Sequence, residues 1–142
     1  MKKYLLLTVL FSCLFSSEIL DEIENLYYSN DLLKAKEMFE ENEVKTSDYY
    51  YIGYSIYLKL DDLNKANSNL QLAISSSEDD TKYDNDADFL SEFINDLKNS
   101  NKTLTSGFVE DAINEITTLT EKYTTNAIVF YRLGYAYAEN DD

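Results

Sequence analysis

The amino-acid sequence predicts an all-α protein built from antiparallel helix hairpins. Its 142 residues contain no proline and only three glycines, so the residues that interrupt helices are almost absent. Apolar residues recur at helical spacing and not in the alternation that a half-buried strand requires. The pattern is clearest over residues 49–74, where two apolar stripes follow one another.

The two stripes in residues 49–74 predict a pair of helices joined by a short turn. The first stripe has the spacing i, i+3, i+4, i+7 and consists of Tyr49, Ile52, Gly53 and Ile56. The second has the spacing i, i+4, i+7 and consists of Ala66, Leu70 and Ala73. A glycine inside a helix costs about 1 kcal/mol relative to alanine, so Gly53 requires a packing reason. We expect the second helix to cross there, because Ala66 and Ala73 would let the two backbones approach.

The same pattern recurs along the chain, as expected for hairpins that bury their apolar faces by stacking. The first stripe returns near the C-terminus as Phe130, Leu133, Gly134 and Tyr137. The second returns as Ala112, Ile116 and Leu119. Residues 31–35 parallel residues 62–66, and Phe39 follows Ala35 as Leu70 follows Ala66.

This arrangement resembles the tetratricopeptide repeat family, whose period is about 34 residues. The resemblance implies a right-handed α-solenoid of helix hairpins behind an N-terminal leader. The expected units are residues 18–45, 46–76, 86–124 and a partial unit 125–142, with an acidic insertion over residues 75–88. The sequence differs from the family pattern at Asn42, where a small residue is usual, and in having no proline between units.

The first 17 residues have the layout of a secretory signal peptide. Two lysines precede an apolar run over residues 4–15, which Ser16 and Ser17 follow. The run is too short for a membrane span, which needs about 20 residues. Residues 10–13 also resemble the lipobox of bacterial lipoproteins, in which Cys13 would be lipidated. The leader therefore predicts an exported protein of the bacterial periplasm or cell envelope. Lipidation at Cys13 and a buried first helix are the alternatives to a plain secretory signal.

Composition excludes several functional classes. The chain has no histidine, and its single cysteine, Cys13, lies in the leader. Histidine-centred triads, cysteine nucleophiles and zinc sites are therefore not expected in the folded part, and no cofactor is expected. The net charge of −15 repels nucleic acid and anionic lipid. The expected partners are proteins or peptides of apolar to basic character.

Elements before residue 108 follow from stripes and turn residues. Ser17 is a plausible N-cap of a helix over 18–28 with a stripe of Ile19, Ile23 and Leu26, and a second helix is expected over 31–43. The acidic residues 75–88 predict a solvated loop. A helix is expected over 86–99, burying Phe89, Phe93 and Leu97, and residues 101–107 are expected to turn the chain.

Alternating acids in the insertion partly match a calcium-binding loop. Asp84, Asp86 and Asp88 match the first ligands of an EF-hand, but Phe89 replaces its glycine and Asn95 its closing glutamate. The sequence therefore predicts no calcium site.

The last two helices are expected over 108–122 and from 126 onward. Because the last helix has no partner helix after it, Phe130, Leu133 and Tyr137 are expected to be covered on one side only. Either the chain is a fragment or a partner covers that face, and the fragment is the preferred interpretation.

Tyrosines supply the candidate binding residues. A second stripe, rotated from the buried one, consists of Tyr50, Tyr54 and Tyr57, and Tyr131 and Tyr135 repeat it. The resemblance places these rings on the concave groove of a solenoid, where they would hold a peptide. The alternative is that they pack against neighbouring helices. Arg132 would meet an acidic group of the ligand or stay solvated.

Three functions follow. The first is an exported scaffold that binds a partner segment through the tyrosine-lined groove. The second is an assembly component that stacks on another solenoid subunit. The third, a carboxylate-dependent hydrolase, is disfavoured because no acid falls on a predicted apolar face, where burial would raise its pKa. The protein is therefore expected not to be an enzyme.

Overall fold

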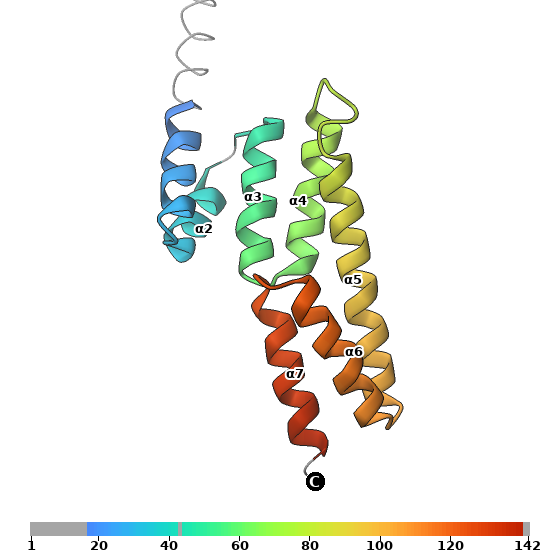
Figure 1. Cartoon of the computed structure of the whole chain (residues 1–142). Coiled ribbons are helices and arrows are strands. Elements are labelled where there is room, and N and C mark those ends of the chain that lie inside the picture. Colours follow the sequence, from blue (N-terminus) through green and yellow to red (C-terminus); the bar gives the residue numbers. More distant parts are fainter. Residues whose placement is uncertain (1–16, 43, 141–142) are drawn as a thin grey trace, which may run out of the picture. The chain divides into compact units, whose positions relative to one another are not determined.

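A computed structural model describes residues 17–42 and 44–140 (Figure 1), and these residues form helices without a strand. The first helix covers residues 17–28. The other helices are α2 (Leu32–Glu41), α3 (Ser47–Lys59), α4 (Leu63–Ser76), α5 (Asp84–Thr105), α6 (Val109–Lys122) and α7 (Ala127–Asn140). The chain divides into two units, Met1–Lys82 and Tyr83–Asp142, and each is described by itself. The predicted all-α class is confirmed.

Three helix hairpins share one type of turn. Asn30, Asp61 and Gly107 each adopt a positive φ just after a helix, with values of 64°, 59° and 83°. At each turn the next amide N–H reaches back to a carbonyl inside the preceding helix. These bonds are Asp31 N to Leu26 O, Asp62 N to Tyr57 O and Phe108 N to Thr103 O. This is the Schellman motif, which satisfies carbonyls that the helix end leaves free.

A new helix begins directly after each of these turns. Asp31, Asp62 and Phe108 precede α2, α4 and α6, and their carbonyls accept from Ala35, Ala66 and Ala112. Asp62 also caps α4, since its carboxylate accepts from the Lys65 amide at 3.1 Å. The predicted turns near Asn30 and Asp61 are thus confirmed, and both depend on a residue that tolerates the left-handed conformation.

The core of the first unit forms around α3. Both predicted stripes are buried: Tyr49, Ile52, Gly53 and Ile56 on α3, and Ala66, Leu70 and Ala73 on α4. From α2, Phe39 stacks on Tyr49 with ring centroids 4.5 Å apart. The Tyr49 hydroxyl donates to the backbone carbonyls of Phe39 and Asn42. Helix α3 is therefore held by α2 on one side and by α4 on another.

Gly53 has the packing reason that the sequence predicts, but with different neighbours. A β-carbon at this position would lie 2.4 Å from Phe39 Cζ and 2.9 Å from Asn69 Oδ1. The closest atoms are therefore an aromatic ring from α2 and an amide from α4, and not Ala66 and Ala73. The second helix does approach Gly53, as predicted, through Asn69 of α4, and Phe39 of α2 adds a contact that the spacing did not predict.

In the second unit, α5 is longer than the sequence predicts at both ends. It begins at Asp84, within the expected loop, and continues through Thr105, within the expected turn. Asp84 and Asp86 lie in the first turn, where the helix dipole favours negative charge, and Lys102 lies in the last. The hydroxyls of Thr103 and Thr105 donate hydrogen bonds to backbone carbonyls one turn earlier, so the helix continues through these polar residues.

The buried face of α5 is also shifted from the prediction. Leu90, Phe93, Leu97 and Ser100 are buried, whereas Phe89 is 37% exposed. Phe93 packs on Tyr123, which follows α6, with ring centroids 4.6 Å apart. Phe93 and Leu97 therefore lie in the core as predicted, and Phe89 lies at its edge.

Helix α6 packs as expected, and Ala112 and Ile116 are buried on it. Helix α7 packs on α6 (Figure 1), and its buried residues are Val129 and Ala136. About half of Phe130 and of Tyr137 is exposed, as expected for a stripe that is covered on one side only. No described helix follows α7 to cover the predicted stripe.

The leader lies outside the described residues, so the predicted signal peptide and the lipidation of Cys13 stay predictions. Among the described residues, no helix combines the length and the apolar character needed to cross a membrane.

Candidate functional site

The three predicted tyrosines of α3 are mostly inside the first unit. Tyr50 is half-buried, and Tyr54 and Tyr57 are each only 3% exposed. Tyr57 packs edge-on against Phe39, with centroids 6.0 Å apart. Tyr54 lies beside Tyr51, with centroids 5.6 Å apart. For Tyr54 and Tyr57 the structure supports the alternative interpretation, packing against neighbouring groups, over an open aromatic surface.

Tyr57 also ties three helices together through its hydroxyl. It donates to Glu40 Oε1 of α2 at 2.6 Å, and Lys65 Nζ of α4 lies 2.8 Å from the same oxygen. The Lys65 ammonium lies 4.9 Å from the centre of the Tyr57 ring. Burial, and then the Glu40 carboxylate, raise the pKa of Tyr57 to about 12. The hydrogen bond from Lys65, followed by that from Tyr57, lowers the pKa of Glu40.

A similar network joins α5 to the end of α6. The Tyr123 hydroxyl donates to Asp96 Oδ2 at 2.7 Å, and Lys122 Nζ lies 2.8 Å from both Asp96 and Glu92. The bond from Lys122 is the main cause that lowers the pKa of Asp96, with a smaller contribution from Tyr123. The sequence analysis did not predict this network. The one feature of the sequence that indicates this network is the i, i+4 spacing of Glu92 and Asp96, which places both carboxylates on the same side of the helix.

Helix α7 carries four exposed aromatic residues. The α7 aromatic face consists of Phe130, Tyr131, Tyr135 and Tyr137. Their exposed fractions are 49%, 76%, 51% and 51%. At 100° per residue these positions and Gly134 share one side of the helix. Tyr131 and Tyr135 are therefore open to a partner, as predicted, and Phe130 and Tyr137 join them.

Only one of the two charged side chains of α7 belongs to this exposed surface. Glu139 is exposed, and its hydrogen bond is the main cause that raises the pKa of Tyr135. Arg132 is half-buried, and its Nη1 donates to the carbonyl of Leu97 in α5 at 3.0 Å. Burial lowers the pKa of Arg132. Arg132 therefore anchors α7 to α5 instead of standing free in solvent.

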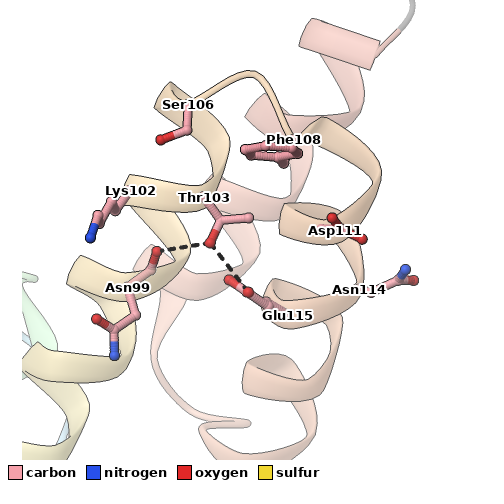
Figure 2. Close-up of a pocket in the computed structure, with 8 residues that line it drawn as sticks. All are labelled: Asn99, Lys102, Thr103, Ser106, Phe108, Asp111, Asn114 and Glu115. Atoms are coloured by element: carbon pink, nitrogen blue, oxygen red, sulfur yellow. Dashed lines mark hydrogen bonds between the residues drawn. The ribbon is translucent and has the colours of Figure 1, made fainter.

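An open hollow of about 620 Å³ lies between the end of α5 and the start of α6 (Figure 2). Its lining residues are Asn99, Lys102, Thr103, Ser106, Phe108, Asp111, Asn114 and Glu115. The Thr103 hydroxyl lies 3.2 Å from both Asn99 O and Glu115 Oε1, and these two contacts fix the position of Thr103 in the lining. Every other lining residue is exposed. The hollow therefore offers a hydrated surface of mixed charge, without a buried acid or base to carry catalysis.

Among the described residues, no group of three or more acidic side chains converges on a point that could hold a metal ion. Asp84, Asp86 and Asp88 lie in the helical backbone of α5, whereas an EF-hand ligand loop is not helical.

Comparison with known protein families, with curated proteins and with solved structures finds no match to this chain.

Proposed function

We propose that the protein is an exported protein-interaction scaffold of the tetratricopeptide type that binds a partner through the α7 aromatic face. The observation that carries this proposal is the exposure of four aromatic side chains on one side of a single helix. Three hairpins with the same Schellman turn support the repeat architecture.

The chemistry of this face suits protein binding better than catalysis. Tyr131, Tyr135 and Tyr137 present flat apolar rings with a hydrogen-bonding tip, and few rotatable bonds become fixed on binding. Phe130 adds a fully apolar ring beside them. Clustered aromatic residues of this kind typically supply much of the free energy of binding at protein interfaces.

The electrostatic properties of the chain limit the partner. The chain carries a net charge of −15, and Glu139 is the one exposed charge of α7 among the described residues. An acidic partner would be repelled before contact, whereas a neutral or basic segment would be attracted. The proposed partner is therefore an apolar to basic segment of another exported protein.

The binding surface in this proposal differs from the groove first expected. Tyr54 and Tyr57 are buried in the core of the first unit, and Tyr50 lies at the edge of that core. Tyr131 and Tyr135 stay in the proposed site, and Arg132 positions the helix that carries them.

Site-specific photo-crosslinking in the cell that makes the protein tests this function. A benzophenone amino acid at Tyr131 is expected to form a discrete adduct with one other exported protein, identified by mass spectrometry. The matched control carries the same group at Glu121, an exposed position of α6. Equal labelling from both positions, or no adduct from Tyr131, would refute the proposed surface.

Self-association is the competing use of the same face. Two copies would bring together two chains of net charge −15, which opposes contact at low ionic strength. Sedimentation at rising protein concentration is expected to show a monomer. A dimer that Tyr131→Ala dissolves would favour the assembly component instead.

A further inference from the structure

This inference rests on the proposed function and specifies the partner element. We infer that the α7 aromatic face receives an amphipathic helix of a partner protein that resembles α4. Such a helix has a small residue, a leucine and a small residue at i, i+4 and i+7, and no acidic side chain after its N-cap.

The first argument is the correspondence between α3 and α7. The four stripe positions of α3 are Tyr49, Ile52, Gly53 and Ile56, and those of α7 are Phe130, Leu133, Gly134 and Tyr137. The tyrosines beside the stripe correspond as well, Tyr50 with Tyr131 and Tyr54 with Tyr135. The two helices therefore present nearly the same surface to a neighbour.

The second argument is that this surface is covered in α3 and open in α7. Tyr49 is 3% exposed, but its counterpart Phe130 is 49% exposed. Ile56 is fully buried, whereas Tyr137 is half exposed. Both helices are in contact with the helix that precedes them, α3 with α2 and α7 with α6. On the following side, α4 makes the most extensive helix contact of the described chain with α3, whereas no described helix follows α7. Phe39 of α2 adds to the cover of α3 by stacking on Tyr49.

The third argument is the unexplained glycine of α7. Gly53 is required because a β-carbon there would meet Phe39 and Asn69. Gly134 has no atom of another group within 4 Å of the same point, although a glycine inside a helix costs about 1 kcal/mol relative to alanine. A closely approaching helix would give Gly134 the role that Gly53 has in α3.

Charge identifies the kind of helix. The helix that covers α3 carries one charged side chain, Lys65, and no acid. On α7, Glu139 is the charge that an incoming helix would meet, and many carboxylates lie elsewhere on the chain. A neutral or basic helix is attracted to such a surface, while a second copy of this acidic chain is not.

The test uses a fluorescent synthetic peptide that copies residues 62–77 as the probe. Its anisotropy is expected to rise saturably with added protein. Gly134→Leu, which fills the open position, and Phe130→Ala, which removes an aromatic contact, should each weaken binding at least about tenfold. Thr118→Leu, on the exposed side of α6, is the matched control and should leave affinity within about twofold. Circular dichroism confirms that each variant is folded.

Several results would overturn the inference. They are no saturable binding up to about 1 mM peptide, binding that Gly134→Leu leaves intact, or equal affinity for a peptide carrying Ala66→Glu. A crosslink from position 134 that falls on a second copy, or on a continuation of this chain, would also overturn it. An adduct from Tyr131 to another protein without binding of the peptide would leave the proposed function standing and refute only the helical partner.

Discussion

The ring of Phe39 lies against Gly53 so closely that a β-carbon at position 53 would come within 2.4 Å of Phe39 Cζ. The ring also stacks on Tyr49 and meets Tyr57 edge-on. Because rings on two sides hold Phe39, it has little freedom to move away from a larger residue at position 53.

Gly53→Ala is therefore expected to destabilise the protein, while Gly134→Ala is expected to stabilise it. Both changes gain up to about 1 kcal/mol of helix propensity, but overpacking at position 53 costs about 1–3 kcal/mol. Nothing lies within 4 Å of the corresponding point at Gly134. Urea denaturation measures both free energies of unfolding. If the two variants shift the midpoint in the same direction, the packing described for α3 is incorrect.

Tyr57→Phe is expected to lower the free energy of unfolding at neutral pH. It is also expected to make that free energy fall less steeply as the pH rises into the alkaline range. Losing the bond to Glu40 costs about 0.5–1.5 kcal/mol. The folded pKa of about 12 lies above the unfolded value of about 10. The contribution of Tyr57 is thus complete below pH of about 10 and is lost as pH rises toward 12.

Urea denaturation at pH 8 and across the alkaline range checks the Tyr57 prediction. Tyr131→Phe, at an exposed ring, is the control and should change neither the neutral stability nor the alkaline slope. An alkaline slope that Tyr57→Phe leaves unchanged would contradict the assigned network.

Asp96→Asn is expected to destabilise the second unit above pH of about 4 and to have progressively less effect below it. Lys122 lowers the pKa of Asp96 in the folded state, so its stabilising contribution is lost as pH falls through that folded value. The effect at neutral pH should be at most about 1 kcal/mol, because the pair is partly exposed. Thermal denaturation between pH 2 and 7, with Glu110→Gln as control, measures this difference. A difference that stays constant over the whole range would argue against the ion pair.

Export is expected to remove the leader. The intact mass of the protein recovered from the cell envelope should correspond to cleavage near Ser16 or Ser17, and Cys13→Ser should leave this mass unchanged apart from any uncleaved precursor. An N-terminal cysteine that carries acyl chains would instead establish the lipoprotein alternative.

The sequence predicts the first unit well, because each signal there is local. The stripes of α3 and α4 and the turns at Asn30 and Asp61 follow from spacing and from residues that tolerate a positive φ. The prediction fails where polar residues continue a helix, as at both ends of α5, since acids at the N-terminus and threonine back-bonding do not show in an apolar pattern.

The candidate site shows what spacing alone does not decide. Tyr54 and Tyr135 have the same place in their stripes, yet one is buried and the other is half exposed. The difference arises from which helices lie alongside, and this depends on contacts between distant residues. For the same reason Phe39, which reaches Gly53 from α2 beside Asn69 of α4, was not predicted as a neighbour of Gly53.

Helices α3 and α7 carry matching faces, one covered and one open to a helix. Hydroxyl-radical footprinting of the protein, with and without the residue 62–77 peptide, measures the exposure of both faces. We expect rapid oxidation of Phe130 and Tyr137 in the free protein, protection of both by the peptide, and slow oxidation of Tyr49 throughout. Equal oxidation rates for Tyr49 and Phe130 in the free protein, or no protection of Phe130 at saturating peptide, would contradict it.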